Sequence, residues 1–344
     1  MKTKHLLLSA ALSIASLCQA QNTITVDNSV GSNAQYSNLQ SAISAASSGD
    51  VIYIHPSEIN YGNVNIDKEI TLIGYSHLGT EKQTLVTDIV LLNNASNSKF
   101  SGLHLTDDFY TNNTNVLSGI IVENCYIKST MTFNSAGVDD IIIRGNIIYQ
   151  IGTSGLSSTS NNFTNAIISN NIILYYIGLK NHQSVTIKNN IFLGPYPAFA
   201  INNANDTTGS ITVQNNIFYY NTNSNFDPNS AGVVFENCLS YNMGSGSITA
   251  LAGTNNINDQ NPQFVESNNN SLYEAEMDDY HLQAGSLAIG SGAGGVDMGL
   301  YDGSPFVFNN LGYTNGIPTV KITNITDRIA PGANLSVTIN TNAN

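Results

Sequence analysis

The stretch VTIKNNIF at Val185–Phe192 carries the pattern that decides the fold. Its first, third and eighth residues are apolar, its fourth and fifth are polar, and its sixth is an asparagine. Apolar residues at alternate positions are typical of a strand with one buried face. Five further octets align with it: Ile120–Ile127 (IIVENCYI), Ile141–Ile148 (IIIRGNII), Ala166–Ile173 (AIISNNII), Ile211–Phe218 (ITVQNNIF) and Val233–Ser240 (VVFENCLS). The repetition predicts a solenoid with one octet in each coil.

The sixth position of the octet predicts a ladder of small polar residues inside the solenoid. It is occupied by Cys125, Asn146, Asn171, Asn190, Asn216 and Cys238. A short strand buries its apolar face only when coils stack in register. An asparagine repeated at one interior position can then hydrogen-bond to the coils on both sides through its amide group. Coils stack about 4.8 Å apart, which puts the two cysteines about 24 Å from each other. Because a disulfide needs Cα atoms within about 7 Å, we expect two free, buried thiols.

The N-terminus resembles an export signal. Lys2 and Lys4 precede the apolar run Leu6–Leu17, and Ala20 ends a segment of small residues. We expect residues 1–20 to be a signal peptide that is cleaved after Ala20, and the mature protein to be secreted or held at the cell surface. Lipidation of Cys18 is the less favoured alternative, because bulky Leu17 precedes it. The apolar run is too short to span a bilayer, which needs about 20 residues, so membrane insertion is not expected.

The formal net charge of −13 argues against nucleic acid and anionic membrane surfaces as partners. It also argues against tight binding of polyanionic sugars, unless a bound cation such as Ca²⁺ mediates the contact. The Asn- and Asp-rich turns, for example Asn205-Asp206, would suit Ca²⁺, although turn formation explains them equally well. No HExxH motif, paired-cysteine metal motif or phosphate-binding loop is present.

The octet pattern, apolar-x-apolar-x-x-Asn-x-apolar, resembles that of the right-handed parallel β-helix proteins of the pectate-lyase-like superfamily. Residues 36–43 and 48–54 resemble the capping helix and first coil of that family. Residues 261–265, 279–286 and 295–301 resemble the terminal coils of many secreted bacterial β-helix proteins. The resemblance implies an all-β solenoid over residues 21–310 with an N-terminal capping helix. It does not imply one activity, because this fold hosts lyases, hydrolases, epimerases, adhesins and inert scaffolds.

Two outward columns of the solenoid are unexpectedly apolar. The second octet position includes Ile121, Ile142 and Ile167, and the seventh position is apolar or aromatic in every octet. Exposed stripes of this length are usually covered. Apolar residues alternate with polar ones in the tail, residues 311–344, so we expect it to form strands, and residues 318–344 to fold back on the solenoid or cap its end. The alternative is a docking surface for another protein.

The best candidates for catalytic residues occupy the fourth octet position, which is Glu123, Arg144, Ser169, Lys188, Gln214 and Glu236 in successive octets. A polysaccharide lyase needs a base beside the uronate carboxyl group and a cation to neutralise it. Lys188 is the candidate base and Arg144 the candidate neutralising group. Glu123, Glu236 and Tyr196 are candidate substrate-binding residues. In the favoured structural alternative, Arg144 only pairs with Glu123 on the adjacent coil.

Paired carboxylates for hydrolysis are less favoured. Asp107-Asp108, Asp139-Asp140 and Asp278-Asp279 lie next to turns, where aspartate is ordinary. The sequence therefore predicts a monomeric, secreted β-helix protein that binds or processes extracellular polysaccharide, for instance as a lyase. The alternative is a noncatalytic surface scaffold or adhesin that mediates protein interactions.

Overall fold

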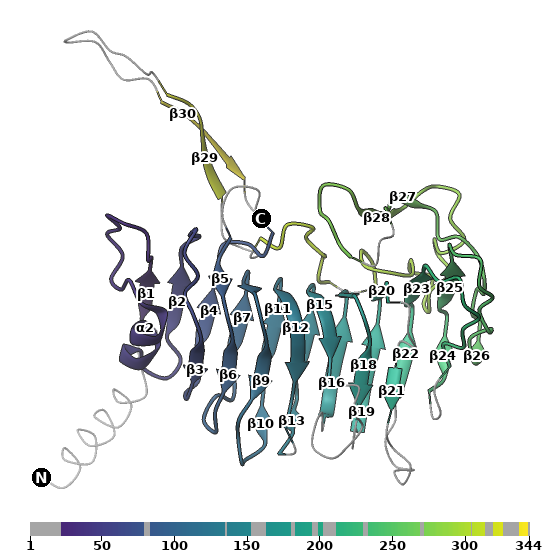
Figure 1. The fold of residues 1–344 in the computed structure, drawn as a ribbon, viewed down its shortest axis with the longest axis horizontal. Coiled ribbons are helices and arrows are strands. Elements are labelled where there is room, and N and C mark those ends of the chain that lie inside the picture. Colours follow the sequence, from purple (N-terminus) through teal and green to yellow (C-terminus); the bar gives the residue numbers. More distant parts are fainter. Residues whose placement is uncertain are drawn as a thin grey trace, which may run out of the picture.

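The chain forms a right-handed parallel β-helix with very little helix, as the octets predict (Figure 1). A computed structural model describes residues 22–78, 83–134, 136–152, 163–179, 183–194, 199–201, 211–229, 233–268, 272–303, 305–313, 319–325 and 337–342. The expected signal peptide, the Asn205-Asp206 turn and Tyr196 lie outside these residues. No helix in the described part of the chain is long and apolar enough to cross a membrane.

One long sheet is built from the first half of each octet. Its strands follow one another along the solenoid as β1 (Thr23–Val26), β2 (Val51–Ile54), β4 (Thr71–Ile73), β7 (Lys99–Ser101), β11 (Ile121–Glu123), β14 (Ile142–Arg144), β16 (Phe163–Ser169), β19 (Gln183–Lys188), β22 (Ile211–Gln214), β24 (Phe235–Glu236) and β26 (Gly253–Thr254), with β10 (Leu117–Ser118) and β13 (Val138–Asp139) paired beside them. All of these pairs are parallel, and residues at the same octet position face each other, as Ile187 faces Val213. The sheet therefore has outward columns that run the length of the solenoid.

A second sheet follows the bend in each octet. Its path comprises β3 (Val64–Ile66), β6 (Ile89–Leu91), β9 (Phe109–Thr111), β12 (Tyr126–Thr132), β15 (Ile147–Ile151), β17 (Ile172–Ile173), β20 (Ile191–Phe192), β23 (Ile217–Tyr220) and β25 (Leu239–Asn242), with β5 (Leu85–Val86), β8 (His104–Leu105), β18 (Ile177–Leu179) and β21 (Phe199–Ile201) off this path. Two antiparallel pairs lie outside the coils: β27 (Phe264–Glu266) with β28 (Asp279–Leu282), and β29 (Thr319–Ile325) with β30 (Val337–Asn342).

The interior asparagine ladder is confirmed. The side-chain oxygen of Asn171 accepts hydrogen bonds from the backbone N–H of Asn146 at 2.9 Å and from its side-chain amide at 3.0 Å. Asn190 accepts the same pair of bonds from Asn171, and Asn216 accepts them from Asn190. These asparagines are fully buried. Each therefore satisfies buried polar groups of the neighbouring coil.

The ladder continues through the cysteines at both ends. Asn146 accepts from the backbone N–H of Cys125, and Asn256, which lies outside the six octets, accepts from that of Cys238. Both thiols are free and buried, as expected. A small side chain can therefore replace asparagine where the ladder needs only a filler.

The fifth octet position makes the bend between the two sheets. It is held at positive φ in every octet, by asparagine in five of them (Asn124, Asn170, Asn189, Asn215 and Asn237, φ 50° to 59°) and by Gly145 in the sixth (φ 65°). Only glycine and, less readily, asparagine or aspartate adopt this left-handed conformation at low cost. The fifth residue of the octet therefore turns the chain. The sixth residue, where it is asparagine, bonds one coil to the next.

Helix α2 (Leu39–Ala45) closes the N-terminal end of the solenoid (Figure 1). Asn38 caps its first turn by accepting a hydrogen bond from the backbone N–H of Ser41. Lys68 satisfies its last turn by donating to backbone carbonyls, including that of Ile43. Leu39, like Ile43, is fully buried in the core. The helix thereby covers apolar surface that the first coil would otherwise expose.

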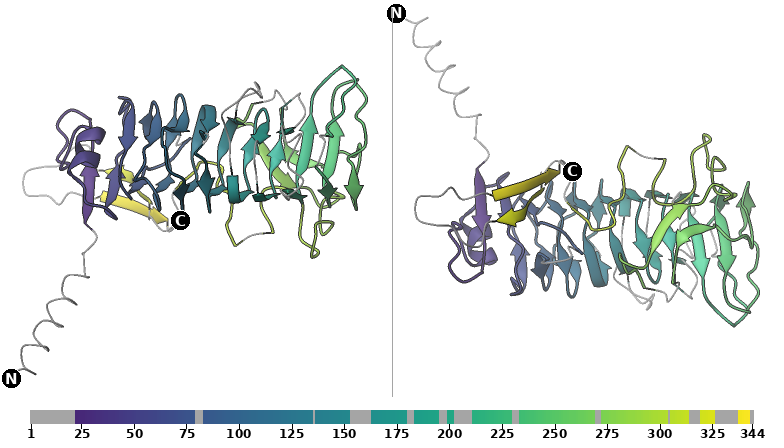
Figure 2. Two further views of the ribbon diagram at one scale, coloured as in Figure 1. Left: turned by 90° about the horizontal axis from the view of Figure 1, so that it is seen from below. Right: turned by 90° about the horizontal axis from the view of Figure 1, so that it is seen from above.

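The apolar seventh column is covered by the chain that follows the last coil. Ile147, Ile172, Ile191, Ile217 and Leu239 form a second apolar cluster with Phe264, Tyr273, Tyr280, Met298 and Leu300. We call residues 264–313 the return segment, because it runs back along the coils toward β5 (Figures 1 and 2). Its bonds follow this path: Asn237 donates to the Ser291 carbonyl, Asn170 donates to that of Leu300, and the backbone N–H of Leu78 donates to the Leu311 carbonyl.

The return segment therefore provides a cover for the seventh column. The tail forms the β29–β30 hairpin, which extends away from the coils in Figure 1. Val337 and Ile339 are exposed. Packing of the tail on the solenoid stays a prediction.

Replacing Asn190 by alanine should strongly destabilise the protein. The side chain of Asn190 bonds to both neighbouring coils, and its loss leaves buried donors and acceptors unpaired at about 1–3 kcal/mol each. We expect the free energy of unfolding in urea to fall by at least about 3 kcal/mol. Asn112→Ala, at an exposed turn, is the matched control and should change stability by less than about 0.5 kcal/mol. Equal effects of the two substitutions would contradict the ladder.

The two coil thiols should resist alkylation at pH 8. Burial raises the pKa of each thiol to about 12, and the thiolate is the reactive form. Treatment with iodoacetamide followed by peptide mass spectrometry should find Cys125 and Cys238 unmodified in folded protein and modified in urea. Rapid labelling of either residue in the folded protein would show that its coil is open.

Candidate functional site

The mixed-charge column of the fourth octet position centres on a buried carboxylate. Glu123 is 3% exposed and accepts from Lys99 at 2.6 Å and from Arg144 at 2.7 Å and 3.0 Å. Two cations thus compensate one buried anion, and each cation remains about one-third exposed. This is the structural alternative that the sequence favoured for Arg144.

Arg144 is also covered on one side by the return segment. Its guanidinium carbon lies 4.8 Å from the centre of the Phe306 ring, within range of a cation–π contact. Phe306 occupies the space that a Cβ on Gly145 would need, which explains why this octet has glycine at its bend. Arg144 is therefore engaged by Glu123 and Phe306 at once.

The other candidates of this column are not brought together into one site. Lys188 follows Ser169 in register and is half-buried, two coils from Arg144, or about 10 Å at the usual spacing. Within the described part of the chain its ammonium group forms no ion pair. Glu236 is exposed and accepts one long bond, of 3.4 Å, from Gln214. The roles of Lys188, Arg144, Glu123 and Glu236 in catalysis or binding stay predictions.

Two of the three aspartate pairs make structural contacts. Asp140 adopts a positive φ of 54°, and Asp139, at the end of β13, accepts from the side chain of Asn165 on the next coil. Asp278 accepts backbone bonds from Asn268 and Glu274, and burial raises its pKa. The first pair thus turns the chain and joins coils, and Asp278 organises its own loop.

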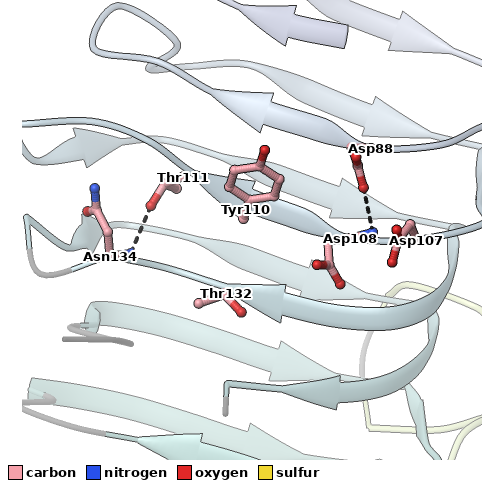
Figure 3. A pocket seen from close by; sticks show the side chains of 7 residues that line it. All are labelled: Asp88, Asp107, Asp108, Tyr110, Thr111, Thr132 and Asn134. Atoms are coloured by element: carbon pink, nitrogen blue, oxygen red, sulfur yellow. Dashed lines mark hydrogen bonds between the residues drawn. The ribbon is translucent and has the colours of Figure 1, made fainter. Parts of the chain in front are cut away.

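The third pair lines a pocket of about 400 Å³ on the second sheet (Figure 3). Asp107 and Asp108 come just before β9, and Asp88 stands at the equivalent place before β6. The remaining lining residues are Tyr110, Thr111, Thr132 and Asn134. Figure 3 shows the three carboxylates at one end, Asn134 and Thr111 at the other, and the Tyr110 ring between them. We call this the Tyr110 pocket.

Backbone hydrogen bonds hold two of these carboxylates in place. Asp88 accepts from the backbone N–H of Asp108 at 2.9 Å, and Asp108 accepts from that of Thr130 at 2.8 Å. The second oxygen of each carboxylate makes no hydrogen bond within the described part of the chain and remains available to a ligand. Asp107 is exposed, whereas Asp88 and Asp108 are half-buried.

The sequence contains a signal for this pocket that lies outside the octets. Asp88 begins the run DIVL and Asp108 begins the run DFYT, twenty residues later. In each run the aspartate precedes an inward apolar residue, and Ile89 pairs with Phe109 in the second sheet. Aligning this second strand of the coil would have placed Asp88 and Asp108 on one outward column.

Among the described residues no group of three histidine, cysteine, aspartate or glutamate side chains is arranged to hold a metal ion. Calcium binding stays a prediction.

No protein-family model and no curated protein matches the sequence. Among solved structures, the chain is similar to the crystal structure of pectate lyase Pel9A, with 14% identity and a TM-score of 0.45. The match covers 86% of this chain and 98% of that chain.

Glu123→Gln should lower stability, because two cations would lose the buried charge that compensates them. We expect a loss of about 1–3 kcal/mol in the free energy of unfolding. The exposed Glu236→Gln variant is the control and should be neutral within about 0.5 kcal/mol. A neutral Glu123→Gln variant would show that the buried ion cluster contributes no net stability.

Proposed function

We propose that this protein binds extracellular polysaccharide through the Tyr110 pocket. The observation that carries the proposal is an open, half-buried aromatic ring flanked by carboxylate, amide and hydroxyl groups on a rigid sheet face. A sugar ring has an apolar face and a rim of hydroxyl groups. Tyr110 can stack against the apolar face, while Asp88, Asp108 and Asn134 meet the hydroxyl groups.

The rigidity of the pocket supports this use. Tyr110 pairs with Thr132 on one neighbouring coil and with Val90 on the other, so its backbone is fixed on both sides. The Asp88 and Asp108 carboxylates are each anchored by one backbone N–H. A preorganised site loses little conformational entropy when a ligand binds.

The charge of the pocket selects the kind of sugar. Three carboxylates repel a uronate carboxyl group unless a cation lies between them, so the pocket itself suits a neutral sugar unit. In an elimination reaction a base removes the proton beside a uronate carboxyl group and the glycosidic oxygen leaves. Lys188, the candidate base, belongs to the other sheet. A lyase activity would therefore require a second site around Lys188. We keep this activity as a more specific proposal than polysaccharide binding.

The noncatalytic alternative is also favoured by a specific observation. At the second octet position Ile167 is 39% exposed and Val234 is 54% exposed, so this apolar column lacks the cover that the seventh column has. A scaffold or adhesin would present such a surface to another protein.

The test is affinity electrophoresis and calorimetry with neutral polysaccharides (xylan, mannan and mixed-linkage glucan) and acidic ones (pectate, alginate, ulvan and glycosaminoglycans), with and without Ca²⁺. Tyr110→Ala should weaken binding about tenfold, because a stacked ring contributes about 0.5–1.5 kcal/mol beyond its buried area. Tyr53→Ala, on an outward position of the first sheet, should leave binding unchanged. Absorbance of an unsaturated product would reveal a lyase, and Lys188→Ala should abolish it. Absence of binding to every polysaccharide would overturn the proposal.

A further inference from the structure

A pair of stacked tyrosines lies beyond the Tyr110 pocket along the solenoid axis. The rings of Tyr149 and Tyr175 are nearly parallel, with an angle of 6° between their planes and 5.3 Å between their centres. Tyr149 is 39% exposed and Tyr175 is half-buried. The Tyr175 ring thus packs on one face of the partly exposed Tyr149 ring and restrains its orientation. This arrangement holds the outer ring as a flat platform.

The platform is physically connected to the pocket. Asp108, a pocket residue, accepts the backbone N–H of Thr130 on the next coil, and the hydroxyl of Thr130 accepts from the side chain of Gln150 at 3.0 Å. Gln150 follows Tyr149 directly in the chain. Asp108 and Tyr149 therefore lie on the same edge of the solenoid, two coils apart, or about 10 Å.

An exposed cation lies between them. Lys128 is on β12, the coil between those of Asp108 and Tyr149, and its ammonium group forms no ion pair within the described part of the chain. It approaches the Tyr126 ring at 5.8 Å. The charge is thus negative at Asp108 and positive at Lys128, one coil later. A polysaccharide that lies along this edge would meet both.

We propose that Tyr149, supported by Tyr175 and flanked by Lys128, forms a second sugar subsite that takes an acidic unit of the polysaccharide whose neutral unit occupies the Tyr110 pocket. This inference rests on the proposed function and adds the direction and class of the ligand. The polysaccharide lies along the solenoid axis. It is a heteropolysaccharide with carboxylated or sulfated units among neutral ones. Tyr149 stacks on the sugar ring, and Lys128 neutralises its anionic group.

The experiment uses glucuronoxylan, ulvan and heparan sulfate as probes, each as oligosaccharides of graded length, and carboxyl-reduced glucuronoxylan as the uncharged match. Tyr149→Ala should weaken binding of the long acidic oligosaccharides about tenfold and leave that of disaccharides unchanged, since the latter reach only the pocket. Lys128→Gln should remove the preference for glucuronoxylan over its carboxyl-reduced form, and Lys128→Arg should keep it. Tyr53→Ala is the control for loss of an aromatic ring elsewhere.

The outcomes separate this inference from the proposed function. If Tyr110→Ala weakens polysaccharide binding while Tyr149→Ala and Lys128→Gln bind every oligosaccharide as the unmodified protein does, the pocket stands and the second subsite is wrong. The subsite is equally wrong if only neutral polysaccharides bind. If no polysaccharide binds at all, the proposed function fails first. Circular dichroism of each variant checks that the coils remain folded.

Discussion

Hydrogen bonding between stacked coils is the constraint on which the rest of the structure depends. A strand of two to seven residues has neither a full apolar face nor satisfied edges when alone. The parallel ladders supply the edge bonds, and the Asn146–Asn171–Asn190–Asn216 row supplies the bonds that the bend would otherwise leave unmade. Each asparagine is useful only if its neighbour is in register. The ladder therefore fixes register as well as satisfying polar groups.

Register in turn decides where surface chemistry can occur. Because equivalent positions align along the axis, each outward residue lies beside its counterparts on the next coils. The seventh position gives an apolar column that the return segment covers, and the fourth gives the buried Glu123 cluster. Asp88, Asp108 and Tyr149, on another edge, are at least partly exposed. We propose that the ligand lies along this edge.

The sequence predicts the coils well because their periodicity is local and repeated. The octets and the buried thiols are confirmed, since both follow from spacing, and so is the capping helix, which the family resemblance of residues 36–43 implied. The return segment was less accessible to prediction, because its contacts join residues far apart in the chain, such as Asn170 and Leu300. The Arg144–Glu123 pair was expected from register, but its cover by Phe306 was not. The pocket was missed for a different reason: Asp88 and Tyr110 belong to a second strand of the coil that the octet frame does not include.

Amide hydrogen exchange measured residue by residue in the intact protein tests the central claim most directly. The backbone N–H groups of Asn146, Asn171 and Asn190 follow a turn residue, where amides ordinarily exchange fast, yet each donates to the side chain of the next asparagine. The account predicts that they exchange as slowly as the core amides of β14, β16 and β19. Exchange of these three amides at the rate of solvent-exposed amides without a hydrogen bond would contradict the ladder.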